Sequence, residues 1–290
     1  MKDQLCEQIG VLLLRRGFSV KCLPRRWFDI IGRRNSTVLF IKVLHDANSI
    51  SPELAEEMRQ LAGFIGGSPL IVAEKAGEQR VDDGVVHSRF GVYTVNVQTF
   101  SDCLAGRLPL IMRSQAGATV SVVGSQLSKS MDSRGYSLSE VSRRMGVSRQ
   151  MVARYRVSRS QVSVRKAEIM HSIFGGEVFE RVDILSGKAD EQRPGESQVA
   201  RKYEALGFRA IDTRKAPFDI VAKLEKEIIL TGVGDKADQS LASLTHLIGA
   251  DNLIIYEHKK PGDKDIPAIK KAEFLDMQTA RELISFLREF

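Results

Sequence analysis

One short segment of this chain, SLSEVSRRMGVSRQMVARYR, has the pattern of two amphipathic helices joined by a tight turn. Leu138, Val141 and Met145 recur at i, i+3 and i+7, which places them on one face of a first helix. Gly146 follows where a helix ends in the left-handed conformation that glycine adopts without strain. This order of residues predicts a compact helix-turn-helix.

The second helix of this segment has one apolar and one cationic face. Ser148 is the predicted N-cap, and Val152 and Tyr155 continue the apolar pattern. The opposite face carries Arg149, Gln150 and Arg154. In a DNA major groove, arginine can recognise guanine and glutamine adenine through paired hydrogen bonds. The pattern favours a DNA-binding surface over an ordinary helical hairpin.

Positive charge is concentrated around the same segment. Between Gly124 and Phe174 there are ten lysines and arginines and three acidic residues. The net charge of this region is therefore +7, which equals the formal net charge of the whole chain. The rest of the 290 residues are about neutral. A local basic surface is typical of a module that contacts phosphates, and a solvated basic face is the alternative.

Other functional classes are not favoured by the sequence. The longest apolar runs are far too short to span a bilayer, and the N-terminus lacks a signal-peptide core. Cys6, Cys22 and Cys103 form no CxxC pair and predict reduced, buried thiols. The histidines have no metal-ligand spacing. We therefore expect a cytoplasmic protein without a metal, a cofactor or a membrane contact.

The two regions that flank the helix-turn-helix repeat each other. Gly17-Phe18 and the tripeptide Phe28-Asp29-Ile30 recur, at one common offset, as Gly207-Phe208 and Phe218-Asp219-Ile220. The pattern of residues 64–72 recurs at residues 247–255, where the offset is smaller. The second copy is therefore about seven residues shorter between its third strand and its second helix.

Each copy has the periodicity of a helix, three strands, a helix and a strand. In the first copy the apolar stripes of the helices are Leu5, Ile9 and Leu12, then Leu54, Met58, Leu61 and Ile65. Short apolar runs after helices predict an α/β domain. The expected fold class is α/β plus all-α, with domains at residues 1–117, 118–178 and 195–290. Residues 114–117 and 186–195 are the expected linkers.

The flanks resemble restriction-endonuclease-like folds, on the strand order and on Asp29 and Lys42. That resemblance implies a divalent metal bound by such an aspartate and by an acid two residues before the lysine. Phe40 occupies the acid position here, and the second copy keeps Asp219 but has Leu230 and Gly232 at the matching positions. We therefore expect catalytically inactive scaffold domains in which both aspartates are structural or surface residues.

The central segment resembles the Cro/C1, or phage-repressor-type, helix-turn-helix. A preceding helix is expected at about 125–134 and a following one at about 164–174. The chain up to about residue 174 is also similar to archaeal HTH-type transcriptional regulatory proteins, in FDIIGRR, LFIKVL, LAGFIGGSPLIVAEK, DDGVVHSRFGV and GVSRQMVARY. The sequence departs from that family at Arg156, where a glutamate usually follows the tyrosine.

The resemblance implies which residues meet DNA. Base edges would be contacted by Arg149, Gln150 and Arg154. Phosphate-contacting or capping residues would be Ser137, Arg143, Arg144 and Ser148. Such modules act as dimers on two half-sites, and the α/β flanks are the expected dimerisation surface.

The leading interpretation is a sequence-specific, double-stranded DNA-binding transcriptional regulator. It would be a homodimer and not an enzyme, with its recognition helix at about Ser148–Arg156. One alternative is a metal-dependent nuclease with migrated ligands, using Glu7 or Glu227 with Asp29 or Asp219. A second alternative is an RNA-binding or scaffold protein whose helical hairpin is a docking site.

Overall fold

The computed structural model describes residues 2–23, 27–114, 117–186, 193–214, 216–235, 240–261 and 266–290. Two compact units divide the chain: Met1–Val43, Ile50–Leu70 and Leu185–Phe290 form the first, and Leu44–Ser49 and Ile71–Ile184 form the second. Of the expected linkers, residues 115–116 and 187–192 lie outside the described residues. In the part of the chain that is described, no helix is long and apolar enough to cross a membrane.

The N-terminal part of the first unit follows the predicted order of elements. Helix α1 (Lys2–Arg15) buries Leu5, Ile9 and Leu13, which recur every four residues. The expected Leu12 is only half-buried. The elements that follow are β1 (Ser19–Cys22), β2 (Ile30–Arg34), β3 (Thr37–Asp46) and α2 (Pro52–Ile65), with strand order β1-β2-β3. The next strand, β4 (Ser68–Ala76), begins in the first unit, and its residues from Ile71 onwards belong to the second unit.

The C-terminal part of the first unit has the same order of elements. They are α8 (Gln198–Ala205), β12 (Arg209–Asp212), β13 (Ile220–Leu224), β14 (Glu227–Val233), α9 (Ser240–Ile248) and β15 (Asp251–Tyr256). The strands lie in the order β12-β13-β14-β15-β16, with β14 and β15 parallel. The chain ends with β16 (Ala268–Lys270), α10 (Lys271–Asp276) and α11 (Ala280–Arg288).

Backbone conformations recur at corresponding positions of the sequence repeat. Gly17 and Gly207, which end the first helix of each part, have φ of 76° and 94°. Asn35 and Glu225, in the two matching hairpins, have φ of 54° and 52°. Positive φ is uncommon outside glycine, so its occurrence at this corresponding pair of positions indicates that the two hairpins have the same turn.

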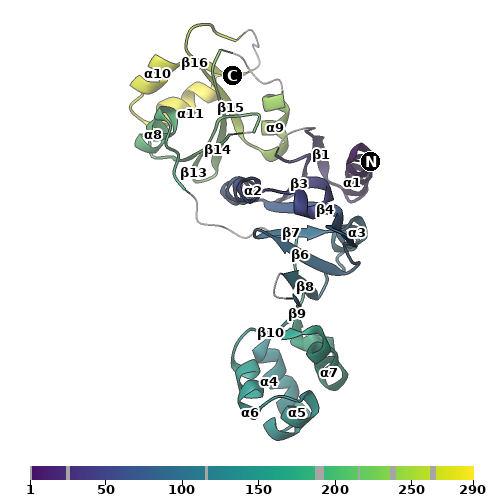
Figure 1. Cartoon of the computed structure of the whole chain (residues 1–290). Helices are drawn as coiled ribbons and strands as arrows, with labels where there is room; N and C mark the ends of the chain where they lie inside the picture. The colour runs from purple at the N-terminus through teal and green to yellow at the C-terminus, as the bar shows by residue number, and fades with distance from the viewer. Residues whose placement is uncertain are drawn as a thin grey trace. The chain divides into compact units, whose positions relative to one another are not determined.

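The two parts of the first unit pack together around one apolar cluster. The cluster takes corresponding residues from each part: Phe28 and Phe218, Ile31 and Val221, Phe40 and Leu230, Leu61 and Leu244, and Ile65 and Ile248. Figure 1 shows α9 beside β1, where this packing occurs. Burial of these side chains stabilises the association by about 1.5–3 kcal/mol for each fully buried large apolar residue.

Polar contacts at the edge of the cluster are reciprocal. Nη1 of Arg33 donates to the carbonyl oxygen of Leu247 at 3.2 Å, and Nζ of Lys223 donates to that of Phe64 at 3.3 Å. In the sequence repeat Lys223 is the counterpart of Arg33. Leu247 is likewise the counterpart of Phe64. Each contact therefore has its equivalent with the roles exchanged, as in an isologous two-fold interface.

The side chain at the acid position belongs to this packed surface. Phe40 is 1% exposed, and a Cβ built on Gly67 would lie 2.5 Å from its ring. At the corresponding positions the second part has the smaller Leu230 and, in place of the glycine, Ala250. An apolar residue at this position therefore contributes to the association of the two parts.

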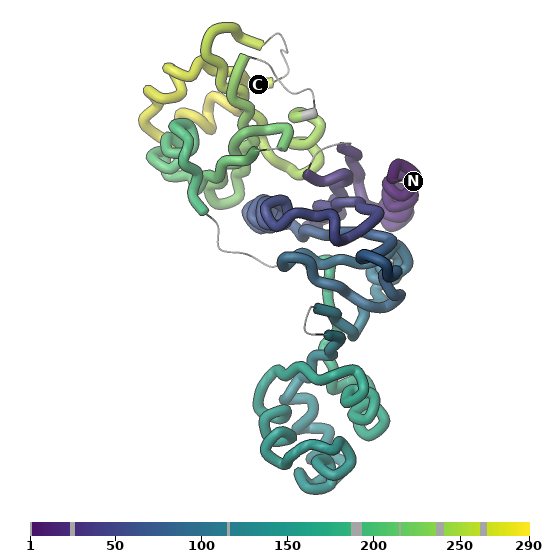
Figure 2. The backbone as a smooth tube through the Cα atoms, in the orientation of Figure 1, coloured from purple at the N-terminus to yellow at the C-terminus, as the bar shows by residue number. Residues whose placement is uncertain are grey.

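The second unit joins a sheet to a helical module. Its strand order is β4-β7-β6-β8-β9-β10. The elements before the module's first helix are the 3₁₀ helix η1 (Ala47–Ser49), β5 (Gln79–Arg80), β6 (Val85–Arg89), β7 (Val92–Val95), α3 (Val97–Leu104), β8 (Ile111–Ser114) and β9 (Gly117–Val122). Figure 2 shows the teal chain passing from β8 and β9 into the module.

The helical module has four helices and three short strands. It consists of β9 with α4 (Gly124–Ser133), α5 (Leu138–Met145), α6 (Arg149–Val157), β10 (Ser160–Ser163), α7 (Val164–Phe174), η2 (Gly176–Val178) and β11 (Phe179–Glu180). The helices predicted before and after the helix-turn-helix are confirmed as α4 and α7. Between α6 and α7, β10 pairs with β9 and buries Val162.

The three cysteines have different environments. Cys103 is buried, and burial raises the pKa of its thiol to about 11. Cys6 is half-buried, whereas Cys22 is exposed at the end of the edge strand β1. The expectation of buried thiols was therefore wrong for Cys22, because side chains of an edge strand alternate between the core and solvent.

Candidate nucleic-acid interface

The turn between α5 and α6 is closed by local hydrogen bonds. Ser137 and Glu140 form a reciprocal capping box at the start of α5, and the backbone N–H of Ser137 lowers the pKa of the Glu140 carboxyl. Gly146 ends α5 with φ 62° and ψ 41°, as predicted. The hydroxyl of Ser142 donates to the carbonyl oxygen of Val147 at 2.7 Å. This hydrogen bond links the last turn of α5 to the residue after Gly146.

The predicted apolar faces of α5 and α6 meet in the core of the module. Val141 and Val152 are fully buried, and Met145 and Tyr155 are nearly so. Residues of the other elements complete this core: Val120, Val122, Leu127, Met131, Val162, Ala167, Met170, Ile173, Phe174, Val178 and Phe179. Since one face of each helix is buried, the opposite face of α6 points to solvent.

Helix α4 contacts the end of α6 through a glycine. A Cβ built on Gly124 would lie 2.8 Å from each of three carbonyl oxygens, those of Tyr155, Arg156 and Ser158. The φ of Gly124 is not positive, so the backbone conformation would accept other residues. Glycine is required here because the neighbouring carbonyl oxygens leave no room for a side chain. The first residue of α4 therefore sets how closely α4 approaches α6.

Replacing Gly124 by alanine is expected to lower the free energy of unfolding of the full chain by about 1–3 kcal/mol, because backbone atoms must move to admit the methyl group. Gly10→Ala is the control, because that glycine lies inside α1 with no atom within 4 Å of a built Cβ. The control should be neutral or stabilising by up to about 1 kcal/mol. Urea denaturation followed by circular dichroism measures both. Equal stability of the two variants would contradict the close approach.

The three predicted base-contacting side chains are exposed on α6. Arg149 and Gln150 lie in its first turn, and Arg154 lies one turn after Gln150, on the same side of the helix. Arg149 makes one long contact, from Nη1 to the hydroxyl of Ser139 at 3.4 Å. Met151, 37% exposed, follows Gln150. The sequence pattern assigned no functional role to this methionine, although it is an apolar residue outside the apolar stripe.

The residues predicted to contact phosphate or to cap helices differ in the contacts that they make within the module. The hydroxyls of Ser137 and Ser148 accept hydrogen bonds from backbone N–H groups, so both are N-caps. Arg143 is exposed. Arg144 lies with its guanidinium 4.9 Å from the Tyr136 ring centre and donates to the Tyr136 hydroxyl at 3.1 Å. This stacking holds the side chain in one direction.

Three other arginines of the basic region bind within the module. Arg134 donates to backbone carbonyl oxygens at the end of α7, and Arg159 pairs with Glu180 at 2.8 Å. Arg156 pairs with Asp132 at 3.0 Å and donates to a serine hydroxyl of α4. Arg156, which stands where a glutamate was expected, therefore links α6 to α4 by an ion pair and a hydrogen bond. The count of ten cations overestimated the charge that is free to meet DNA.

A second candidate site surrounds Asp29 in the first unit. Its carboxylate is 2% exposed and lies 2.8 Å from Nζ of Lys2 and 3.4 Å from Nζ of Lys42. It also accepts from the backbone N–H of Val43 at 2.8 Å. Burial lowers the pKa of the Lys42 ammonium, and the charge of Asp29 opposes this effect. The exposed Asp219 accepts the equivalent hydrogen bond from a backbone N–H of β14.

These residues do not fit a divalent metal. Asp29 is one carboxylate between two ammonium groups, and apolar Phe40 stands where a second acid would be. Glu227 pairs in register with Leu224 at the far end of the hairpin from Asp219. Glu227 and Asp219 therefore do not lie side by side in this hairpin. Among the described residues, no group of three histidine, cysteine or acidic residues could hold a metal ion.

Part of the first flank matches a known family of domains. Residues 2–109 match the PD-(D/E)XK superfamily domain. No solved structure matches this chain.

Over nearly its whole length the chain is similar to archaeal proteins named "Putative HTH-type transcriptional regulatory protein". One from Thermococcus gammatolerans is 28% identical, over 99% of this chain and 96% of the relative. One from Pyrococcus furiosus is 29% identical, over 99% and 98%. One from Methanosarcina mazei is 28% identical, over 99% and 97%.

Proposed function

We propose that this chain is a sequence-specific regulator of transcription that binds double-stranded DNA through α6. The observation that carries the proposal is the outward row of Arg149, Gln150 and Arg154 on a helix whose other face is fully packed. Met151 adds an apolar side chain that suits the methyl group of thymine. The names of the archaeal relatives support the same function.

The finer assignments belong to the same proposal. The order α4, α5, α6 and α7 suits a module of the Cro/C1 type. The proposed domains are residues 1–117, 118–178 and 195–290, with the third as a second, degenerate nuclease-like copy. The reciprocal contacts of Arg33 and Lys223 support that last assignment. A regulator of this kind would act in the cytoplasm, where the DNA is.

A homodimer is also proposed, because two recognition helices would double the base contacts and impose a symmetric site. The flanks were expected to supply the dimer surface. Since their apolar cluster is shared within one chain, the dimer would need surfaces of the flanks outside it. Light scattering of the full chain tests this arrangement. A monomer at concentrations where it binds DNA specifically would contradict it.

Selection from a random duplex library tests the function itself. The full chain is expected to enrich one sequence motif and to bind it more tightly than random duplex at about 150 mM salt. Competition with RNA distinguishes the RNA-binding alternative. An unenriched pool, or equal competition by RNA, would contradict the proposal.

The second candidate function is a nuclease, which the PD-(D/E)XK superfamily match favours. The surroundings of Asp29 oppose it, because the carboxylate is bound by two lysines and lacks an acidic neighbour. Incubation of supercoiled plasmid with Mg²⁺ or Mn²⁺ tests it. Nicking by the wild-type chain that Asp29→Asn abolishes, at a temperature where the variant is still folded, would establish the nuclease and refute the inactive scaffold.

A further inference from the structure

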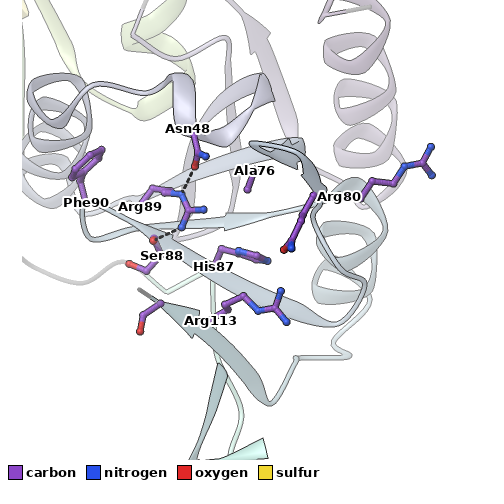
Figure 3. A pocket seen from close by; sticks show the side chains of 10 residues that line it. Asn48, Ala76, Arg80, His87, Ser88, Arg89, Phe90 and Arg113 are labelled. Atoms are coloured by element: carbon purple, nitrogen blue, oxygen red, sulfur yellow. Dashed lines mark hydrogen bonds between the residues drawn. The ribbon is translucent and has the colours of Figure 1, made fainter. Parts of the chain in front are cut away.

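The second unit contains a cavity that the DNA-binding proposal does not use. It has a volume of about 840 Å³, within the range of small-molecule binding pockets. Its lining comes from the ends of β4 and β5, from β6 and β8, and from η1 (Figure 3). Most of the residues that line it have a polar or basic side chain, and Asn48, Gln79, His87, Arg89, Phe90 and Arg113 are among them.

A row of polar side chains crosses three strands beside this cavity. His87 of β6 is directly opposite Thr94 of β7 and Arg113 of β8, so the three side chains lie on one face of the sheet. His87 is 4% exposed, and its Nε2 has no hydrogen-bond partner. The fully buried hydroxyl of Thr94 has none either. Buried polar groups of native proteins are nearly always paired, so an unpaired histidine on a cavity wall points to a ligand.

The charge around His87 favours an anion. From its own strand it faces Arg89, and from β8 it faces Arg113, with Asp82 as the nearby acid. Arg113 pairs with Asp82 at 3.0 Å, which uses only part of its five-donor guanidinium. Arg89 donates its Nε to the Asn48 side chain at 3.0 Å, which orients it (Figure 3). Burial and both arginines lower the pKa of the His87 imidazole, and an anion would offset that effect.

The turn between β6 and β7 presents an aromatic ring at the same cavity. Phe90 has φ 47° and Gly91 has φ 82°, so both central residues of the turn have positive φ. A type I′ turn normally has asparagine, aspartate or glycine at the first of these positions, and a bulky residue is strained there. The ring is nevertheless 48% exposed. The fold thus holds an aromatic face at the cavity wall at a conformational cost.

We propose that this cavity binds a small phosphate ester with a flat ring, the chemistry of a nucleotide. The phosphate lies against His87 and Arg113, where charged donors and an unpaired ring nitrogen converge. The base stacks on Phe90. Inorganic phosphate alone would leave most of the cavity empty. The site does not depend on the proposed DNA-binding function.

Titration calorimetry of the full chain with adenosine and guanosine 5′-phosphates tests the site. At least one nucleotide is expected to bind more tightly than inorganic phosphate. Arg113→Gln should weaken it by about tenfold or more, because a charge-assisted hydrogen bond is lost. Arg107→Gln is the matched control, since Arg107 is also an exposed arginine paired with one aspartate but lies outside the cavity. It should leave the affinity unchanged.

Two further variants distinguish the contacts to the phosphate from the contacts to the base. His87→Gln should weaken both nucleotide and inorganic phosphate, and Phe90→Ala should weaken the nucleotide alone. Thermal unfolding of each variant shows that the fold is kept. No nucleotide binding at millimolar concentration, or equal effects of Arg113→Gln and Arg107→Gln, would overturn the proposal. Displacement of bound nucleotide by random duplex at equal phosphate concentration would identify a nucleic-acid backbone as the occupant and overturn the assignment to a small molecule.

Discussion

Alanine at Arg149 or at Gln150 is expected to relax sequence preference by about 1–3 kcal/mol each, measured between a cognate and a mismatched duplex. Both side chains are exposed in the first turn of α6, beside a well-packed face that holds the helix in place. Each can form two hydrogen bonds with one base, which alanine cannot. The double variant should therefore lose most of its selectivity while keeping its general attraction to DNA.

Arg143→Ala is the control for this experiment, because Arg143 is exposed on α5 and is expected to meet phosphate. It should weaken cognate and random duplexes alike and reduce the slope of log affinity against log salt concentration by about one. Arg144→Ala should act in the same way and also remove the packing on Tyr136. Fluorescence anisotropy over about 50–200 mM salt measures these effects. Equal losses on both duplexes for all four variants would contradict the recognition helix.

Asp29→Asn is expected to lower the free energy of unfolding by about 3–5 kcal/mol, because it removes the negative charge beside a buried lysine. The side chain of Lys42 is 10% exposed, and its Nζ lies 3.4 Å from the carboxylate. The pair with Lys2 contributes little, since that lysine is 43% exposed. Asparagine still accepts from the backbone N–H of Val43, so the loss reports the charge and not the hydrogen bond.

Two controls isolate this effect in urea denaturation. Asp219→Asn changes the corresponding exposed carboxylate, where Gly232 replaces the lysine, and should cost less than about 1 kcal/mol. Combining Asp29→Asn with Lys42→Met should recover much of the stability, because the buried positive charge is removed as well. Similar losses for Asp29→Asn and Asp219→Asn would contradict the buried charge cluster. At temperatures where the chain is folded, neither variant should change DNA affinity.

The helical module shows how far local patterns carry a prediction. The helices, the glycine turn and the serine caps were predicted correctly, because spacing along one helix decides each of them. The strand β10 was missed, since it forms only by pairing with β9, about 40 residues earlier in the chain. The sequence also could not show which arginines are exposed and which are bound by other groups of the module. Arg134 and Arg156 are bound by groups on other elements of the module.

By itself, the sequence determined the order of helices and strands in the flanks and the two short helices joined at Gly146. These features depend on contacts between residues that are close in the sequence and on the spacing of apolar residues, and both can be recognised in the sequence. Only the tertiary structure decided that Phe40 and Leu230 join one shared cluster, that Asp29 lies between two lysines, and that a strained Phe90 stands beside a cavity. Those features depend on which distant elements meet, and burial and electrostatic pairing act through space and not along the chain.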